Sequence, residues 1–377
     1  MLVGVKRETR SGERRVAATP TSVRQLTKLG LDVVVQSGAG VQAGHDDAAY
    51  RTAGADVVPQ LGQVDLLCHV APLTAEEAGM LQPGTFTVGF AAPATELNTV
   101  AALAQAGVTS FALELIPRIS RAQSMDALSS QSLVAGYRAV LEAAIRFPRF
   151  FPLYMTAAGT VPPARVLVLG AGVAGLQAIG TAKRLGARVS AYDVRPSSAD
   201  EVASLGGTFI NLDLDAIEGA GGYAREMGED RARRQRELLV PHVAASDVLI
   251  TTAAVPGRPA PLLVTTDMVQ GMQGGAVVVD LAAETGGNVQ GSVAGQDILV
   301  SGAGGTVTLV GMKDAASAMA ADASRLFAAN VANLVELMTV DGRVEPDFDD
   351  DVVAGACLTH EGRVAHQPTA AALKGTR

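Results

Sequence analysis

Short apolar segments alternate with stretches of helical period through the first part of the chain. The helical stretches, such as 21–29 and 97–105, end at Gly30 and Gly107, and glycine commonly adopts the left-handed turn that closes a helix. This alternation predicts a parallel sheet whose strands are joined by crossover helices. The segments that we expect to form its strands are 2–5, 32–36, 66–69, 85–90 and 110–112.

A long helical pattern follows. It runs from 130 to 150 and stops where Pro148 and Pro152 arrive, because proline lacks the amide hydrogen that a helix interior needs. We interpret it as a linker helix. A second series of apolar segments then predicts a second α/β unit, with strands at 165–169, 188–193, 208–211, 248–251, 276–280 and 298–300.

The last part of the chain predicts a return to the first unit. Residues 313–338 are alanine-rich with a helical period, and 354–366 suggest a hairpin around Glu361 and Gly362. The expected fold class is α/β, with two Rossmann-like parallel-sheet domains joined by long helices. We expect a first domain of 1–129 with 339–377, the linker helix 130–150, a second domain of 151–312 and the return helix 313–338.

Composition narrows the class of function. Of 377 residues, 48% are hydrophobic and 18% charged, which is typical of a soluble globular enzyme, and a net charge of −8 disfavours nucleic-acid or anionic-membrane partners. Cys68 and Cys357 lie far apart, so we expect no disulfide framework and a reducing, cytoplasmic compartment. We expect no membrane insertion, since the longest uncharged stretches contain prolines or patterned glycines, and no metal, since the histidines lack ligand spacing.

A dinucleotide-binding fingerprint opens the second unit. Gly170, Gly172 and Gly175 follow an apolar strand and begin a helix, and Asp193 ends the next strand. In such fingerprints the first glycine makes a tight turn, the second lets the pyrophosphate approach the backbone, and the third lets helix and strand pack closely. The sequence therefore predicts a bound NAD(H).

Asp193 favours NAD(H) over NADP(H), because a carboxylate accepts hydrogen bonds from the ribose hydroxyls and repels a 2′-phosphate. Its neighbours Val194 and Arg195 are expected to contact the cofactor as well. Arg195 has two interpretations: a solvated surface arginine, which we favour, or a group that accommodates a 2′-phosphate. Val173 and Ala174, at the helix N-terminus, are expected to face the phosphates.

Residues 117–130 form a strongly polar segment between an apolar strand and the linker helix. The segment contains two arginines, an amide, a carboxylate and several hydroxyls. Two interpretations stay open: a ligand-facing loop, or a solvated helix entry that Ser129 or Ser130 caps. Its place just before the linker helix favours the first.

Five strings of the chain are distinctive: RISRAQSMD at 118–126, MTAAGTVPPA at 155–164, GGYA at 221–224, and TTA at 251–253 with PGRPAP at 256–261. They closely resemble the NAD(H)-binding component, domain I, of proton-translocating NAD(P) transhydrogenase, and the resemblance covers almost the whole chain. It implies hydride transfer between NAD(H) bound here and NADP(H) on a partner subunit, coupled to proton translocation by membrane subunits.

The resemblance implies catalytic roles for Arg118, Gln123 and Asp126. Asp126 and Ser129 would position the nicotinamide end, Arg118 would stabilise the loop and nearby phosphate or ribose groups, and Gln123 would reach toward the NADP(H)-bearing partner. Direct hydride transfer needs no general base, so the groups that position the two nicotinamide rings are the catalysts.

Further cofactor contacts follow from the resemblance. The segment 218–236 is similar to the family's mobile loop, which folds over the nucleotide; an ordinary solvated loop and helix is the alternative. The contacts expected from this loop and from the end of a strand in the second unit are Gly222, Tyr223, Met227, Thr252 and Ala253.

Alanine dehydrogenase, which shares this fold, is the main rival. Arg15 resembles its carboxylate-binding arginine, but Phe90 stands near the position of its catalytic histidine, and His69 near that of its catalytic lysine. Phe90 cannot transfer a proton, so amino-acid oxidation is disfavoured. We interpret His69 as structural or as lying at the solvent edge. A non-catalytic NAD sensor is the third hypothesis.

The resemblance also implies partners and a location. We expect the NADP(H)-binding and membrane subunits to be separate polypeptides, and the chain to attach peripherally to the cytoplasmic face of the inner membrane through protein contacts. A homodimer is implied by the resemblance alone.

Overall fold

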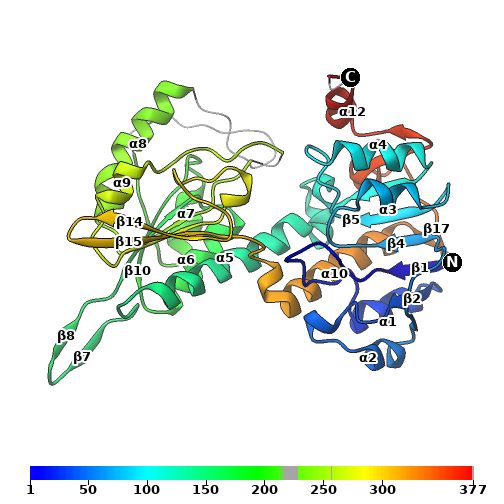
Figure 1. Cartoon of the computed structure of the whole chain (residues 1–377), viewed down its shortest axis with the longest axis horizontal. Helices are drawn as coiled ribbons and strands as arrows, with labels where there is room; N and C mark the ends of the chain where they lie inside the picture. The colour runs from blue at the N-terminus through cyan, green and yellow to red at the C-terminus, as the bar shows by residue number, and fades with distance from the viewer. Residues whose placement is uncertain (213, 215–227, 256, 376–377) are drawn as a thin grey trace. The chain divides into compact units, whose positions relative to one another are not determined.

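The computed structural model describes residues 1–212, 214, 228–255 and 257–375, which form two compact units. Unit 1 comprises Met1–Gln131 and Ala316–Arg377, and unit 2 comprises Ser132–Ala315. Each unit is built on a mainly parallel sheet with helices on its faces (Figure 1). The predicted α/β class with two Rossmann-like sheets is therefore confirmed.

The described sheet of unit 1 has eight strands in the order β19-β18-β6-β5-β4-β1-β2-β3. The strands from β1 to β6 pair in parallel, and β18 and β19 add an antiparallel edge beside β6. The predicted return of the chain as a hairpin is thus confirmed. The strands are β1 (Leu2–Val5), β2 (Asp32–Gln36), β3 (Asp56–Val58), β4 (Leu66–Cys68), β5 (Phe86–Gly89), β6 (Thr109–Ala112), β18 (Cys357–His360) and β19 (Arg363–Val364).

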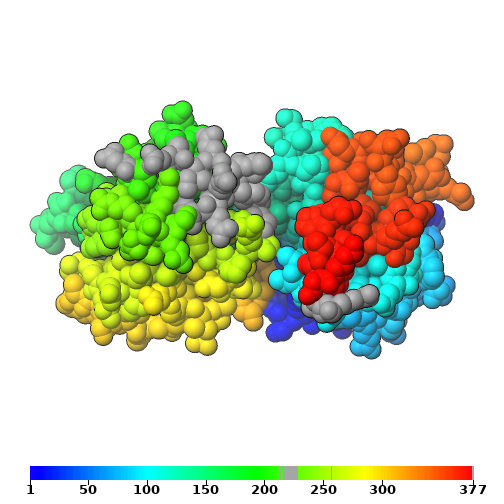
Figure 2. Space-filling model, turned by 90° about the horizontal axis from the view of Figure 1, so that it is seen from above, coloured from blue at the N-terminus to red at the C-terminus, as the bar shows by residue number. Residues whose placement is uncertain are grey.

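The helix α10 (Ala320–Leu337) contributes a long apolar face to the core of unit 1. Phe327, Val331 and Leu334 of this helix pack with the apolar side chains of β1, β2 and β4. At the other end of the sheet, α12, red in Figure 2, lies on the outside of the unit, where Leu373 packs against Val100. The other helices and the small ribbon are α1 (Pro20–Lys28), α2 (Asp47–Thr52), α3 (Ala75–Gly79), α4 (Leu97–Gln105), α11 (Asp351–Ala356), α12 (Gln367–Gly375), the 3-10 turns η1 (Val41–Ala43), η2 (Leu113–Leu115), η3 (Ser120–Met125) and η6 (Ser317–Met319), and β16 (Thr339–Val340) with β17 (Arg343–Val344).

The described sheet of unit 2 has seven strands in the order β11-β10-β9-β12-β13-β15-β14. Only β14 runs antiparallel among them, and it pairs with β15 through a turn at Gly304, which has φ of +74°. The pattern at 298–300 predicted β14 but neither its direction nor β15. The strands are β9 (Arg165–Leu169), β10 (Arg188–Tyr192), β11 (Thr208–Phe209), β12 (Val248–Thr251), β13 (Val277–Asp280), β14 (Asp297–Gly302) and β15 (Gly305–Gly311).

Both faces of the unit 2 sheet are buried. In β9, Val166 and Val168 pack on one face, whereas Leu167 and Leu169 pack on the other, as the two-residue period of a strand requires. Continuous apolar runs are typical of such doubly covered parallel strands. The remaining elements are α5 (Ala127–Arg146), α6 (Val173–Arg184), α7 (Ser198–Ser204), α8 (Glu229–Ala244), α9 (Thr266–Gln270), η5 (Ala283–Thr285) and the hairpin β7 (Tyr154–Thr156) with β8 (Gly159–Val161).

Two long helices differ in extent from their predictions. The linker helix α5 begins at Ala127 and ends at Arg146, before the prolines. The return helix α10 begins at Ala320 rather than at 313, because Asp314 has a left-handed φ of +48° that no helix interior tolerates.

Candidate nucleotide-binding site

Three glycines lie close together at the carboxyl end of the unit 2 sheet, in the turn from β9 to α6. Gly170 has φ of +101°, which favours glycine because it has no Cβ. The Thr252 hydroxyl donates to the Gly170 carbonyl at 3.0 Å, so the turn packs against the end of β12. A Cβ on Gly175 would stand 1.8 Å from the same carbonyl oxygen, so only glycine lets α6 begin this close to the turn.

Gly172 differs from Gly170 and Gly175, because no contact with a described atom requires a glycine at this position. It immediately precedes α6, its φ is −74°, and a Cβ there would meet nothing within 4 Å among the described residues. No side chain of these residues caps this end of α6. Open space before a helix N-terminus suits a phosphate, since the first amides of a helix lack partners within it. A dinucleotide therefore fits this cradle.

Asp193 directly follows β10 and is fixed beside the glycine turn. Its Oδ2 accepts the Ala171 amide at 2.7 Å, and its Oδ1 accepts the Arg195 amide at 2.9 Å. The Arg195 guanidinium donates to the same carboxylate, with Nε at 2.9 Å and Nη2 at 3.1 Å. A carboxylate has about four acceptor positions, and these four bonds use them, so a ribose hydroxyl would have to replace one of the bonds from Arg195.

The favoured interpretation of Arg195 as a solvated arginine is wrong. Its side chain is only 20% exposed, and its hydrogen bond with Asp193 raises the pKa of the guanidinium above its usual value. The pair is neutral as a whole, so it repels a 2′-phosphate less than an isolated carboxylate would. The charge that a ligand meets here is therefore set by both residues.

Two fully buried side chains that the sequence did not single out shape the loop after β12. Asn288 Nδ2 donates to the carbonyls of Ala253 and Pro261, each at 2.8 Å. Asp280, the last residue of β13, accepts the Thr251 hydroxyl at 3.0 Å. Asp280 could have been found by its position, because it is an acidic residue at the end of an all-valine strand.

The other expected contacts in unit 2 fall into two groups. Val173 and Ala174 form the first turn of α6, and Val194 packs against the core face that contains Leu167. Three expected contacts lie outside the described residues: Gly222, Tyr223 and Met227. Binding of NAD(H) by the described residues remains a prediction.

The polar segment of unit 1 forms η3 and then enters α5. Ala122 and Met125 are buried in the core of the unit, whereas Arg118 and Gln123 are exposed. Apolar side chains thus anchor the segment and leave its polar ones on the surface.

Asp126 caps α5. Its Oδ1 accepts the Ser129 amide at 2.8 Å, and its Oδ2 accepts the Ser129 hydroxyl at 2.6 Å. The alternative interpretation, in which Ser129 or Ser130 is the cap, is wrong on this point, because the helix begins at Ala127. Asp126 and Ser129 are joined and half-buried, so a ligand would meet them as one polar group.

The residue that resembles the carboxylate-binding arginine of alanine dehydrogenases already has a partner in unit 1. Arg15 pairs with Glu13, with Nη2 to Oε2 at 2.6 Å and Nε to Oε1 at 2.8 Å, and both side chains are nearly buried. Arg15 Nη1 also donates to Gln131 Oε1 at 2.9 Å. Its guanidinium carbon lies 5.9 Å from the ring centre of Phe90 and 6.0 Å from that of Phe327. A substrate carboxylate would have to compete with Glu13.

His69 is buried, so the solvent-edge interpretation is wrong. Its side chain is 3% exposed, and its Nδ1 lies 2.8 Å from the Ala71 carbonyl oxygen. Burial lowers the pKa of the imidazole to about 4, which keeps it neutral at physiological pH. A Cβ on Gly89 would stand 2.5 Å from Nδ1, so the ring and the glycine are complementary.

Two half-buried carboxyl groups in unit 1 were missed by sequence reasoning. Burial raises the pKa of Glu8 and of Glu114 to about 7 in each case. Glu8 accepts the Val70 amide at 2.7 Å, and Glu114 accepts the amides of Ala91 at 2.9 Å and Ala92 at 2.7 Å. No local sequence signal distinguishes them from surface glutamates, because their burial depends on strands that are distant in sequence.

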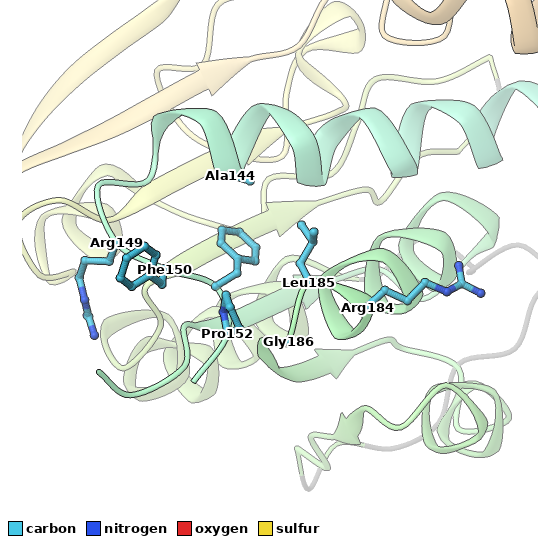
Figure 3. A pocket seen from close by; sticks show the side chains of 8 residues that line it. Ala144, Arg149, Phe150, Pro152, Arg184, Leu185 and Gly186 are labelled. Atoms are coloured by element: carbon cyan, nitrogen blue, oxygen red, sulfur yellow. The ribbon is translucent and has the colours of Figure 1, made fainter. Parts of the chain in front are cut away.

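A cavity of about 490 Å³ in unit 2 lies away from the glycine turn. It is lined by the C-terminal part of α5 and by Gly186, which precedes β10, so it lies near the amino ends of the strands (Figure 3). In this view the Arg149 side chain points downward at the left and the Arg184 side chain points to the right, so they do not converge on one anion. Ligands of parallel sheets bind at the carboxyl ends, which favours the glycine turn over this cavity.

Within the described ranges, no group of three or more His, Cys, Asp or Glu side chains could hold a metal ion. Among the same residues, no helix has the length and apolar character needed to cross a membrane.

The fold and the glycine turn define a two-domain α/β protein of the dinucleotide-binding class. Residues 4–135 match the N-terminal domain and residues 139–367 the C-terminal domain of the family described as alanine dehydrogenase/PNT. The chain belongs to the alanine dehydrogenase/PNT family.

Relatives divide into two groups. The chain is 46% identical to the first part of the divided NAD(P) transhydrogenase subunit alpha of Rhodospirillum rubrum, over 97% of this chain and 98% of that protein. It is 42% identical to a transhydrogenase structure from Sinorhizobium meliloti, with a TM-score of 0.85 and coverage of 98% and 100%. Alanine dehydrogenase of Mycobacterium tuberculosis is 34% identical over 78% of this chain and 75% of that protein. The predicted resemblance to the transhydrogenase component is confirmed, and alanine dehydrogenase is a more distant relative.

Proposed function

We propose that this chain is the NAD(H)-binding component of a proton-translocating NAD(P) transhydrogenase. The single observation that carries the proposal is the open cradle at Gly172, before an uncapped helix N-terminus and beside the fixed carboxylate of Asp193. The names of the relatives, transhydrogenase alpha subunits that match nearly the whole chain, supply the reaction.

In unit 2 we assign the cofactor contacts as follows. The amides of Val173 and Ala174 bind the pyrophosphate, because the N-terminus of α6 carries partial positive charge. Asp193 accepts the adenosine ribose hydroxyls in exchange for one of its bonds from Arg195, whose remaining bonds hold the carboxylate in place. Thr252 and Ala253 contact the cofactor from the end of β12, and we retain Gly222, Tyr223 and Met227 as proposed contacts.

In unit 1 we assign the positioning groups of the reaction. When bound, NADH supplies the hydride from C4 of its nicotinamide ring, and the two reacting carbons must approach to about 3–3.5 Å. Asp126 and Ser129 position the carboxamide end of the ring, Arg118 stabilises the loop, and exposed Gln123 extends toward the partner's NADP(H). A neutral amide suits Gln123, because it bonds either dinucleotide without favouring one charge state.

We further propose that the partners are separate NADP(H)-binding and membrane subunits, with this chain as a homodimer attached peripherally on the cytoplasmic face of the membrane. The names of the relatives, which describe subunit alpha or a part of it, support the presence of partner subunits in a complex.

Calorimetric titration with NADH tests the cradle. We expect Gly172→Ala to weaken binding by about tenfold or more, because an added methyl in a close contact costs about 1–3 kcal/mol. Gly62→Ala is the matched control, since a Cβ at Gly62 also meets no atom within 4 Å. Equal NADH affinity of Gly172→Ala and the control would contradict the proposed site.

Hydride transfer is tested by mixing the chain with an NADP(H)-binding transhydrogenase component and following reduction of an NAD⁺ analogue by NADPH. Transfer is expected only when both proteins are present. Failure despite verified association of the two proteins would favour an NAD sensor instead. Robust NAD⁺ reduction by alanine with the isolated chain would revive the dehydrogenase hypothesis, which Phe90 and the Arg15–Glu13 pair disfavour.

A further inference from the structure

Two asparagines of α10 donate to the polar segment of unit 1. Asn330 Nδ2 donates to the Ser124 carbonyl at 2.8 Å, and Asn333 Nδ2 donates to the same carbonyl at 3.0 Å. Asn330 makes a second bond, in which its Oδ1 accepts the Ser130 hydroxyl at 2.7 Å. The two partners of Asn330 stand on either side of Asp126 and Ser129 in the chain.

Asn330 is the more constrained of the two asparagines. It is 6% exposed and lies in α10 beside the buried Phe327, Val331 and Leu334, where an amide without partners costs several kcal/mol. Its Nδ2 donates to Ser124 and its Oδ1 accepts from Ser130, so both polar atoms of the buried amide have partners in this segment. A change in the conformation of the segment would leave the buried amide without these partners.

A second connection ties the loop to the C-terminal part of unit 1. The Arg121 guanidinium donates to both carboxylate oxygens of Asp350, at 2.9 and 2.8 Å, and Asp350 also caps α11 through the Val352 amide at 2.8 Å. This ion pair is exposed at Arg121, so water and salt screen it and its contribution to stability is small. The buried amide is therefore the stronger of the two connections.

We propose that Asn330 is a positioning residue that fixes the segment carrying Gln123, Asp126 and Ser129 from the opposite end of the chain. The proposal rests on the proposed function, in which these three groups act on the nicotinamide ring. Asn330 acts through Ser124 and Ser130. Loss of its bonds should therefore slow hydride transfer and leave binding of the adenosine half of NADH unchanged.

The kinetic test uses Asn330→Ala, which removes one donor to Ser124 and the acceptor of the Ser130 hydroxyl. Asn333→Ala is the matched control, because it removes the other donor to Ser124 and leaves the bond to Ser130. We expect single-turnover transfer from saturating NADH to slow by about tenfold to 100-fold in Asn330→Ala, because small displacements of positioning groups have effects of this size. The NADH dissociation constant should stay within about twofold, since adenosine and pyrophosphate contacts supply most of the affinity. Asn333→Ala should transfer like the wild type. Equal transfer rates in both variants would overturn the proposal.

Limited trypsin digestion supplies a readout that does not depend on activity. Cleavage after Arg118 and Arg121, located by mass spectrometry, should accelerate by about tenfold in Asn330→Ala, the effect of losing about 1.4 kcal/mol of local stability. Cleavage after Arg363 serves as the internal control. Equal acceleration at all three sites would indicate general destabilisation and overturn the proposal. If the wild type transfers no hydride, the proposed function fails, and the digestion still decides whether Asn330 holds the loop.

Discussion

His69 shows how the surroundings of one residue set its chemistry. The ring is buried against Gly89, and its Nδ1 lies within hydrogen-bond distance of the Ala71 carbonyl, so it behaves as a neutral donor. Neutral imidazole is retained because the folded state disfavours the proton: the pKa falls from the ordinary 6.5 to about 4. His69 therefore acts as a structural group, and it lowers the stability of the folded state only at acidic pH.

We expect this loss of stability to appear in the pH dependence of the free energy of unfolding. Above pH 6.5 His69 is neutral in both states; between 6.5 and 4 only the unfolded state binds the proton, so stability is lost as pH falls. Relative to His69→Gln, which can still donate to Ala71, the wild type should lose about 3 kcal/mol of unfolding free energy across this window. Urea unfolding at several pH values measures the difference.

Two carboxyl groups change the stability in the opposite direction with pH, and the comparison with His69→Gln must allow for them. The pKa of Glu8 and of Glu114 is raised from 4.5 to about 7, so the stability that they contribute is complete below pH 4.5 and is lost as pH rises through 7. Both are present in the wild type and in His69→Gln, so they cancel in the difference. A difference that stays constant from pH 7 to 4 would show that His69 is not held neutral.

The Asp193–Arg195 pair leads to a second prediction at this scale. Asp193→Ala should weaken NADH binding by about tenfold, since a hydrogen bond to a charged group contributes about 1.5–3 kcal/mol. Arg195→Ala should instead widen the preference for NADH over NADPH, because it leaves the carboxylate charge uncompensated. Titration of both variants with both nucleotides measures this. Tighter NADPH binding to Arg195→Ala would refute the neutral-pair explanation.

At the scale of elements, close packing of two helices in unit 2 requires a glycine. Gly136 lies within α5, and a Cβ there would stand 2.0 Å from the Ala174 carbonyl oxygen in the first turn of α6. The glycine therefore lets α5 lie directly against the end of α6 that carries the proposed phosphate contacts.

Gly136→Ala should destabilise unit 2 by about 1–3 kcal/mol, because the helices must separate to admit the methyl group. Gly180→Ala, within α6, is the matched control: its Cβ would meet only Leu205, at an ordinary 3.8 Å, and alanine favours a helix over glycine by up to about 1 kcal/mol. Denaturant unfolding should therefore move the two variants in opposite directions. Equal destabilisation of both would refute the packing argument.

Much of the architecture could be predicted from local pattern. The strands β1, β2, β9 and β12 have the predicted bounds, because each is an apolar run in which burial constrains nearly every position. The missed elements differ in this respect. The hairpin of β7 and β8 is almost wholly exposed, so it has no distinct apolar period. In β15, Val307 and Leu309 alternate with threonines, so this strand carried a signal that could have been recognised.

The candidate site divides in the same way. Gly170 and Gly175 could be predicted because their reason is local, namely the turn between one strand and one helix. Asn330 could not be predicted, because its partner Ser124 is 206 positions away and an asparagine in a helix has no signature. The ion pair of Arg195 was misjudged for another reason, since composition does not reveal whether a charged side chain points to solvent or to its neighbour.

For the whole molecule, the distribution of the core has a thermodynamic consequence. The apolar clusters of unit 1 draw only on residues of that unit, and the two clusters on the faces of the second sheet draw only on unit 2. A unit with its own core has the means to unfold cooperatively by itself. The contacts to phosphate and ribose that we propose for the glycine turn and Asp193 belong to unit 2.

We therefore expect scanning calorimetry to resolve two unfolding transitions, one for each unit. NADH should raise chiefly the midpoint temperature of the transition of unit 2. A ligand at 100 times its dissociation constant stabilises the state that binds it by about 2.7 kcal/mol, which corresponds to a rise of about 5–10 °C in the midpoint of a unit of this size. Gly172→Ala should still show both transitions, but NADH should raise the midpoint of the unit 2 transition by much less than in the wild type. Gly62→Ala should behave as the wild type. Because His69 lies in unit 1, His69→Gln should shift the transition of that unit at pH 5 and so identify it. A single transition that NADH raises as a whole would mean that the two cores unfold as one, and would contradict their independence.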